Sequence, residues 1–482
     1  ARDEIRRTAL ATTRRRLDHD PRAAPAWLAI VSAVLLGSCG GSPVSQATNV
    51  DPPVAQASVP AAPASSGAPP FASAPPSPSP PPSSAGPATG SSGSPTEDRI
   101  VALEARLRRN PNDGEALRDL GALLLQRVRE TADPSLYQRA EEAFDRARHE
   151  IPDDPYVLVG IGTLELARHE FAAALKTGRQ ALSMEAVLPE AEGVVVDALV
   201  ELGRYDEAVE AAQRMIDLRP NLASFARVSY LRELHGDLSG ALDAMESAIS
   251  AGGGATENVA YVTVLAGNLL TYLGRRQDAG AAYRAALSTF PDFTPALAAQ
   301  GRAAVAAGDF PTAIARFSRA AAIVPLPEYV IALGEAQEAS GDMAAARRSY
   351  DLARAETRLF EASGVVVDLE LGLFEADHGD PVVALELARD AYRERPTIKA
   401  SDALAWALYR NGRLGEARDR LGESLRLGTR DPVLLYHAGM IEAAAGDRKH
   451  ARAHLQAALD LDAGFSATGA AAARRTLLAL GG

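Results

Sequence analysis

The sequence predicts an all-α fold in which about ten pairs of helices stack one after another as a solenoid. From residue 135 onward an alanine recurs at spacings of 33, 34 or 38 residues, and a period of this length indicates a repeated supersecondary unit. Seven residues after most of these alanines another small residue follows, a spacing that places both on one face of a helix. A turn residue, often glycine, precedes each alanine by five positions, so each unit is predicted to be helix, turn and helix.

Residues 1–38 have the layout of an export signal. They carry seven arginines and four acidic residues, a net charge of +3, whereas the whole chain of 482 residues carries −12. The apolar run 26–36 has eleven residues, which is too short for a membrane-spanning helix of about 20 residues. A basic region, a short apolar region and small residues in this order are typical of a secretory signal peptide.

The chain's only cysteine follows this run in the sequence Leu36-Gly37-Ser38-Cys39. This tetrapeptide resembles the lipobox of bacterial lipoproteins, which implies that the signal is removed and that Cys39 is lipidated. Two or more acyl chains give stable membrane attachment, at about 0.8 kcal/mol per buried CH2. Gly40 stands where an aspartate commonly retains enterobacterial lipoproteins in the inner membrane, so the outer membrane is favoured. The alternative is an ordinary signal peptide, or a short anchor, with an incidental cysteine.

Residues 39–96 are predicted to form a disordered tether rich in proline, serine and alanine. Positions 40–96 hold 15 of the 31 prolines and a single charged residue, with almost no large apolar side chains. Such a segment buries too little surface to offset the entropy of ordering the chain. A ligand for a proline-binding groove is the alternative interpretation of the same composition.

The repeats are expected to extend over residues 97–469. The ten recurring alanines are Ala140, Ala174, Ala208, Ala241, Ala279, Ala313, Ala346, Ala384, Ala417 and Ala451. A glycine lies twelve residues before several of them, at Gly162, Gly267, Gly301, Gly334, Gly372 and Gly439. Small residues at fixed registers let helices approach at the near end of the 8–10 Å packing range, so close packing is expected at these positions.

Helices are also expected before and after the repeats. Residues 98–109 are predicted to form a leading helix, and residues 470–482 a C-terminal capping helix, as the ends of a solenoid require. Extra residues near 252–254 and 360–367 are expected to produce a slight bend or a protruding loop. Thr294, which precedes a proline, is expected to cap the first helix of one unit.

The period, the helix-turn-helix layout and the positions of glycine, alanine, aromatic residues and proline resemble the tetratricopeptide repeat (TPR). The resemblance covers roughly residues 97–482. It implies an α-solenoid that winds as a right-handed superhelix and binds a peptide or a partner helix on its concave face. The basic and asparagine clamp that some TPR proteins use for a carboxyl-terminal tail is absent, because Asn268 stands alone with Val264 beside it.

The positions that line the concave face in this family predict the partner-binding residues. In this chain they include Tyr156, Tyr230, Glu233, Tyr261, Asn268, Tyr272, Arg302, Trp406, Tyr409, Arg410, Tyr436 and His437. Aromatic residues and arginine are enriched at recognition surfaces, and Trp406, Tyr409 and Tyr436 form the preferred groove. The alternative is that several of these rings fill gaps between neighbouring repeats.

The sequence contains no motif for catalysis, nucleotide binding or a cofactor. His450 and His454 have the spacing for two metal bonds on one helix, but without an evident third ligand they are interpreted as solvated residues. One cysteine cannot form a disulfide within the chain, and the acidic composition lacks the basic face of a general nucleic-acid binder. We therefore expect no enzymatic activity, no metal, no cofactor and no nucleic-acid partner.

Together these features predict a membrane-anchored bacterial TPR lipoprotein that acts as a non-catalytic scaffold in the cell envelope. The solenoid would lie in the periplasm or at the cell exterior and bind a protein or peptide partner. Without residues 1–38 the net charge becomes −15, which favours neutral or basic partners. The alternative is a structural assembly factor of an envelope machine for secretion, pilus formation or polysaccharide export, and an enzyme is the third hypothesis.

Overall fold

The computed structural model describes residues 95–254 and 256–481. Within these ranges every regular element is a helix, and there are 22 of them. The predicted all-α fold is therefore confirmed. The predicted signal peptide, Cys39 and the tether up to residue 94 lie outside the described residues.

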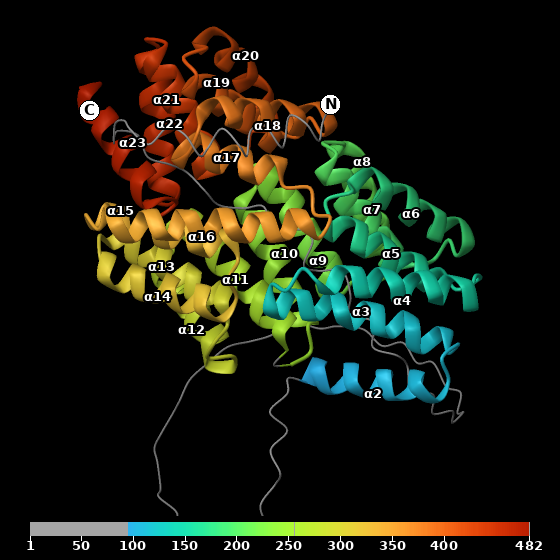
Figure 1. Cartoon of the computed structure of the whole chain (residues 1–482). Helices are drawn as coiled ribbons and strands as arrows, with labels where there is room; N and C mark the ends of the chain where they lie inside the picture. The colour runs from blue at the N-terminus through green and yellow to red at the C-terminus, as the bar shows by residue number, and fades with distance from the viewer. Residues whose placement is uncertain (1–94, 255, 482) are drawn as a thin grey trace, which may run out of the picture. The chain divides into compact units, whose positions relative to one another are not determined.

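Twenty of the described helices form ten consecutive pairs whose members pack on each other, in the order shown in Figure 1. The first helices of the pairs are α3 (Gly114–Thr131), α5 (Pro155–Ala167), α7 (Pro189–Glu201), α9 (Leu222–Leu234), α11 (Glu257–Tyr272), α13 (Thr294–Ala307), α15 (Pro327–Ala339), α17 (Asp368–His378), α19 (Ile398–Arg410) and α21 (Pro432–Ala444). The second helices are α4 (Leu136–Glu150), α6 (Phe171–Met184), α8 (Tyr205–Leu218), α10 (Leu238–Ala251), α12 (Arg276–Thr289), α14 (Phe310–Ile323), α16 (Met343–Ala362), α18 (Pro381–Glu394), α20 (Leu414–Ser424) and α22 (Arg448–Leu461). The leading helix α2 (Pro95–Arg109) and the final helix α23 (Ala467–Ala479) each begin three residues earlier than expected.

Aspartate side chains cap helices at the sequences Asp154-Pro155 and Asp431-Pro432. Asp154 and Asp431 each accept a hydrogen bond of 2.8 Å from the backbone N–H two residues later, and a proline occupies the first turn. The expected cap at Thr294 is wrong, because α13 begins at Thr294 itself and its N-cap residue is Phe293. No side chain caps this helix, and Pro295 in its first turn has no N–H that would need a partner.

The small residues of the repeats lie where helices approach most closely. All ten recurring alanines belong to second helices and are at most 2% exposed. Three of the six recurring glycines of the first helices face large rings of the second helices, and the other three face aliphatic side chains. A Cβ atom at Gly301 would lie 2.6 Å from the Phe317 ring, and one at Gly334 would lie 2.5 Å from the Tyr350 ring. The predicted close packing is therefore confirmed, and each of these pairs closes around a ring that only a glycine admits.

Replacement of Gly334 by leucine is expected to lower the free energy of unfolding by about 1–3 kcal/mol, because the new side chain must displace the Tyr350 ring. Urea denaturation followed by circular dichroism measures the change. Gly415 in α20 provides a matched control, since a Cβ there meets no atom within 4 Å. Gly415→Leu is expected to be neutral or slightly stabilising through its higher helix propensity. Equal losses in both variants would contradict the packing argument.

The extra residues near Phe360 lengthen a helix, which corrects the expectation of a bend or loop. Helix α16 has 20 residues, whereas the second helices of the preceding and following pairs, α14 and α18, have 14 each. Its added turns consist of good helix formers such as arginine, leucine, glutamate and alanine. The next segment reaches an early repeat: the Val366 N–H donates to the Arg168 carbonyl (3.0 Å), and the His169 ring donates from Nδ1 to the Val366 carbonyl (2.8 Å). The extra residues near 252–254 belong to the connection between α10 and α11.

Later repeats pack against earlier ones across the inner face, which the first helices form. The Ile398 N–H at the start of α19 donates to the Tyr205 hydroxyl of α8 (3.0 Å), 193 residues away. Nearby, Arg395 donates to Glu201 of α7, with 3.4 Å between the atoms. Residues of α9 to α13 and of α17 to α23 also share one hydrophobic core. Part of the inner face is therefore covered by the chain itself.

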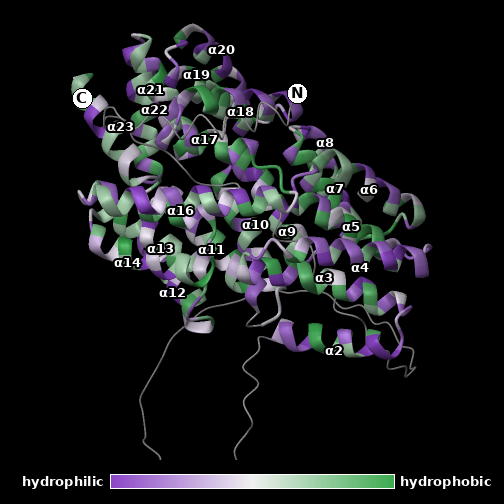
Figure 2. Ribbon diagram, in the orientation of Figure 1, coloured by the Kyte–Doolittle hydropathy of each residue, from purple (hydrophilic) through white to green (hydrophobic). Residues whose placement is uncertain are grey.

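Hydrophobic and hydrophilic residues alternate along the helices, as α4 and α16 illustrate (Figure 2). This alternation places apolar side chains between helices and polar ones toward solvent. Accordingly, none of the helices in residues 95–254 and 256–481 combines the length and the apolar character that crossing a membrane requires.

Candidate binding sites

The expected groove at Trp406, Tyr409 and Tyr436 is not an open surface. The side chains of Trp406 and Tyr436 are 1% exposed, and that of His437 is fully buried. The indole N–H donates a 2.7 Å hydrogen bond to Asp377 Oδ1, and the indole stacks on the His437 ring with the centroids 4.1 Å apart. These side chains fill gaps between neighbouring repeats, which corrects the expectation that they contact a partner.

Tyr409 and Arg410 lie at the margin of the same cluster and are half-buried. The Tyr409 ring stacks on Trp406 with the centroids 5.0 Å apart. The Arg410 guanidinium lies over the indole, 5.9 Å from its centroid, and its NH1 atom is 3.7 Å from Asp377. Both residues therefore contribute to contacts between α17, α19 and α21, and neither forms an exposed recognition surface.

Four other expected residues, Tyr230, Asn268, Tyr272 and Arg302, line one cavity on the inner face of α9, α11 and α13. It has a volume of about 210 Å3. Three of the four share a register, eleven residues before a recurring alanine, which explains why the fold brings them together. The remaining lining residues include Asp197, Ala226, Arg227, Glu233, Met245, Leu265, Arg276, Tyr283, Ala299, Ala303 and Asp462. Tyr261 does not line the cavity and packs half-buried against the core.

Two arginines of the cavity wall have different surroundings. Arg227 is buried and makes a bidentate ion pair with Asp197, with N–O distances of 2.9 and 2.6 Å. Arg302 is half-buried and donates one hydrogen bond of 3.2 Å to Asn268 Oδ1, which also accepts from the Tyr283 hydroxyl at 3.0 Å. Within the described residues, no carboxylate lies within 4.0 Å of the Arg302 guanidinium. Arg302 acts on carboxyl groups only at longer range, lowering the pKa of Asp462, which lines the same cavity, and that of Glu328.

Burial raises the pKa of two titratable groups that line the cavity. Desolvation, and then the nearby Asp431, raise the pKa of Glu233 to about 7, although Lys399 acts in the opposite direction. The pKa of Tyr272 is raised well above its usual value by burial and by nearby carboxyl groups, Glu233 among them, while Arg302 lowers it. Charges of both signs therefore face the Tyr272 hydroxyl inside one cavity.

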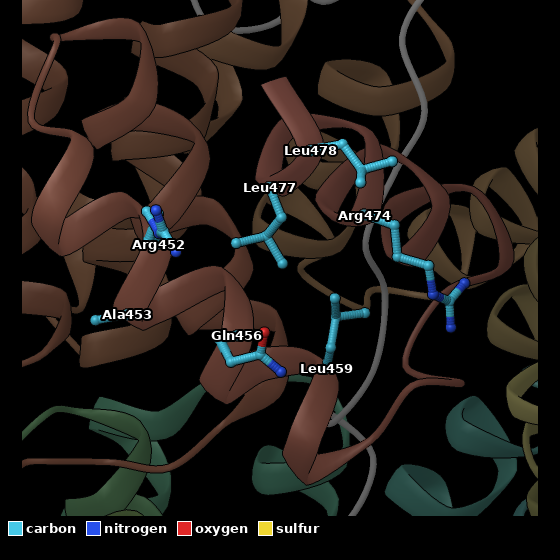
Figure 3. A pocket seen from close by; sticks show the side chains of 7 residues that line it. All are labelled: Arg452, Ala453, Gln456, Leu459, Arg474, Leu477 and Leu478. Atoms are coloured by element: carbon cyan, nitrogen blue, oxygen red, sulfur yellow. The ribbon is translucent and has the colours of Figure 1, made fainter. Parts of the chain in front are cut away.

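A second hollow lies between α22 and α23 at the C-terminal end (Figure 3). It has a volume of about 620 Å3 and is lined by Arg452, Ala453, Gln456, Leu459, Arg474, Leu477 and Leu478. Leu478 is 73% exposed, so the outer side of α23 carries an apolar side chain beside the arginine. This end of the solenoid is thus less polar than the capping role alone predicts.

Exposed apolar side chains gather where α5 and α7 begin and α6 and α8 end. They are Tyr156, Met184, Val187 and Leu218, with exposed fractions between 39% and 64%, and we call them the Tyr156 surface. Glu185, Glu190 and Arg219 lie close enough to influence the Tyr156 phenol, whose pKa burial and the two glutamates raise. Of these four residues the sequence predicts only Tyr156 as a binding residue, because Met184 and Leu218 end the second helices α6 and α8 and Val187 lies in the connection between α6 and α7. The apolar pair Val187-Leu188 directly before Pro189 was the available signal.

The two histidines considered as metal ligands each contact a carboxylate. His450 Nδ1 lies 2.8 Å from Asp447 Oδ2, and His454 Nδ1 lies 2.8 Å from Glu442 Oε2. In the part of the chain that the structure describes, no three metal-ligating side chains are grouped to hold an ion. The histidines thus belong to separate carboxylate contacts.

Comparison with known proteins identifies the repeats. The sequence matches the tetratricopeptide repeat family model at residues 196–256, 264–325 and 298–359, whereas no curated protein sequence matches it. Similar solved structures include a TPR protein of Thermus thermophilus, 20% identical over 37% of this chain and 92% of that one, with a TM-score of 0.33. Human IFIT1 is 14% identical, covering 76% and 93% of the two chains (TM-score 0.41). PilW, a type IV pilus biogenesis factor, is 16% identical, covering 43% and 97% (TM-score 0.36). The chain therefore contains tetratricopeptide repeats, and its described part folds as an α-solenoid built from them.

Proposed function

We propose that this chain is a lipid-anchored, non-catalytic scaffold of the bacterial cell envelope that holds a protein partner near the membrane. The lipobox-like sequence at Cys39 supports the anchor, and the proline-rich composition of residues 40–94 supports a tether. The repeat solenoid supports the binding role, because stacked repeats present extended surfaces to partners.

The Tyr156 surface is the proposed docking site for the partner. Tyr156, at 44% exposed, is the only aromatic residue among the exposed large apolar side chains of the described residues. This single observation carries the proposal, because an aromatic anchor beside aliphatic contacts is typical of binding hot spots. Glu185 and Glu190 near the phenol favour a partner that brings basic residues to the margin of the surface.

A structural assembly factor of an envelope machine is the second candidate. The observation that favours it is the covering of the inner face by later repeats. A partner helix is about 10–12 Å wide and cannot enter a cavity of about 210 Å3, so docking along an edge remains. Co-purification with one complex at fixed stoichiometry would support this candidate, whereas exchange between partners would support the scaffold.

Photocrosslinking from position 187 in intact cells tests the proposed function. We expect a crosslink to a discrete partner that Tyr156→Ala removes, because the anchoring ring is lost. Leu352→Ala is the matched control. Leu352 is also an exposed apolar residue, but it lies on α16, outside the Tyr156 surface, so this variant is expected to keep the crosslink. In the same cells Cys39→Ser is expected to move the chain from the membrane to the soluble fraction. A membrane-bound Cys39→Ser variant would overturn the lipid anchor, and a crosslink insensitive to Tyr156→Ala would overturn the docking site.

A further inference from the structure

The cavity between α9, α11 and α13 is lined by charged side chains of both signs, Arg302 and Glu233 among them, which the proposed docking of a protein partner does not use. We propose that it binds a small molecule with both a carboxylate and an ammonium group, a free amino acid being the simplest member of this class. Arg302 would hold the carboxylate and Glu233 the ammonium. This function goes beyond the proposed scaffold and does not depend on it.

Arg302 is the anion-binding side of the cavity. Its guanidinium has five N–H donors, of which one bond, to Asn268 Oδ1, is present. The neighbouring Arg227 shows how this fold satisfies an arginine that serves structure alone, through a buried bidentate pair with Asp197. Arg302 lines the same cavity with no carboxylate of the described residues within 4.0 Å. A ligand carboxylate would supply the planar, bidentate partner that this side chain prefers.

Glu233 is the cation-binding side. Its carboxyl group lines the cavity and, within the described chain, has no cation within 4.0 Å and no hydrogen-bond donor. Lys399, which approaches from α19, donates instead to the Tyr230 hydroxyl, at 3.1 Å. Burial holds the pKa of Glu233 at about 7, so the carboxyl ionises near neutral pH when a cation is present. An ammonium group would provide that cation and up to three donors.

The position of the two groups indicates one ligand that bridges them. Arg302 and Glu233 line the same cavity and act with opposite sign on the Tyr272 hydroxyl, yet they do not pair with each other. Opposite charges kept apart across a cavity are complementary to a dipolar molecule placed between them. The apolar side chains of Ala226, Met245 and other lining residues leave room for an aliphatic part.

Size and access agree with a ligand of this class. An apolar cavity of about 150 Å3 is known to hold benzene, so a volume of about 210 Å3 suits a molecule of amino-acid size. The lining residues Arg276 and Ala303 are exposed, which places an opening on the side of α12 and α13. The ligand could therefore enter without unfolding of a repeat.

Isothermal titration calorimetry of the full chain with each of the twenty free L-amino acids tests the proposal. Measurements at pH 8, above the Glu233 pKa of about 7, keep that carboxyl ionised. We expect at least one amino acid to bind with a Kd below about 1 mM. Arg302→Gln and Glu233→Gln are each expected to weaken binding about tenfold or more, through loss of one charged contact. Arg316→Gln, at an exposed position on α14, is the matched control and should leave the Kd unchanged.

Modified ligands provide a test that does not depend on the folding of the variants. The N-acetyl derivative and the amide of the best amino acid each lack one charge, and both are expected to bind about tenfold or more weakly than the parent. The proposal is overturned if no amino acid binds the wild-type chain, if neither variant changes the Kd, or if either modified ligand binds as well as the parent. These outcomes leave the crosslinking result at position 187 unaffected, so the two proposals fail separately.

Discussion

Replacement of Trp406 by alanine is expected to lower the free energy of unfolding by about 3–5 kcal/mol, the usual cost of removing a large buried ring. The indole is 1% exposed and contacts three other rings, those of Tyr409, Tyr436 and His437. Its N–H also donates to the buried Asp377 carboxylate. The variant would leave a void at the junction of α17, α19 and α21 and weaken a contact that links three repeats.

Urea denaturation monitored by circular dichroism measures this loss. Trp406→Phe is the informative companion, because it keeps an aromatic ring but removes the hydrogen bond to Asp377 and part of the indole volume, at an expected cost of about 1–3 kcal/mol. We therefore expect Trp406→Ala to be the least stable, Trp406→Phe to be intermediate and the wild type to be the most stable. A Trp406→Ala variant with unchanged stability but a lost partner crosslink would contradict the buried placement and support the groove that the sequence suggested.

The local architecture of the repeats was predictable because it depends on short-range patterns. Spacing placed the alanines in the second helices and predicted close packing at the glycines twelve residues earlier, which the structure shows for example at Gly301 and Gly334. Both depend on contacts within one pair of helices, where a helical period and side-chain size decide the packing. The ends of elements are less predictable: the sequence predicts Thr294 as a cap, whereas it is the first residue of α13.

The role of the inner positions was not predictable in the same way. Arg302 and Trp406 occupy the same register, eleven residues before a recurring alanine, yet one lines a cavity and the other lies in the core. Trp406 is enclosed by side chains of the two neighbouring repeats. Later repeats also return onto earlier ones, as in the bond between Ile398 and Tyr205. That return depends on small rotations between neighbouring repeats, which add up along the solenoid and leave no signal in one repeat.

Polar side chains at matching inner positions of neighbouring repeats were the sequence signal that could have revealed a buried inner face. Asp197 and Arg227 lie 30 residues apart on consecutive first helices and form a buried pair. His437 and Asp402 do the same across α19 and α21, with 2.7 Å between Nδ1 and Oδ2. Oppositely charged or hydrogen-bonding residues at matching inner positions are expected where water is excluded, because a buried charge requires a partner. They point to an inner face that the chain itself buries.

The second large effect is expected from Glu335, whose buried carboxyl group should make stability depend on pH. Glu335 is 3% exposed on α15, and burial raises its pKa to about 8. Its Oε2 accepts a 2.9 Å hydrogen bond from Ser466, which also caps α23. The groups that face it from the packed elements are Ser466 and the Ala467 N–H at α23, Glu338 on its own helix, Tyr350 on α16 and His378 on α17, whose Nε2 lies 3.6 Å from Oε1.

The sign of the pH effect follows from the raised pKa. A carboxyl with a pKa of about 8 in the folded chain, against 4.5 as its usual value, stabilises the fold fully below pH 4.5, and this contribution is lost as the pH rises through 8. His378 acts in the opposite sense, because burial lowers its pKa to about 4, so its contribution is complete above pH 6.5 and is lost as the pH falls through 4. Wild-type stability is therefore expected to be highest between pH 4.5 and pH 6.5. It should decline toward pH 4 as His378 becomes charged and toward pH 8 as Glu335 becomes charged.

Glu335→Gln isolates the carboxyl contribution, because the amide keeps the shape of the neutral acid and cannot ionise. The variant and the wild type are expected to be similarly stable near pH 5, and the variant more stable by a few kcal/mol at pH 9, since each unit of pKa shift corresponds to about 1.36 kcal/mol. Urea denaturation at both pH values measures the difference, with Glu246→Gln, at an exposed position of α10, as the matched control. A variant that is equally destabilised at both pH values would show instead that an ionised carboxylate holds α23 against α15. If the stability advantage of Glu335→Gln grows as the pH rises, the neutral acid holds α23 against α15. The contact that closes this end of the solenoid then weakens in alkaline conditions.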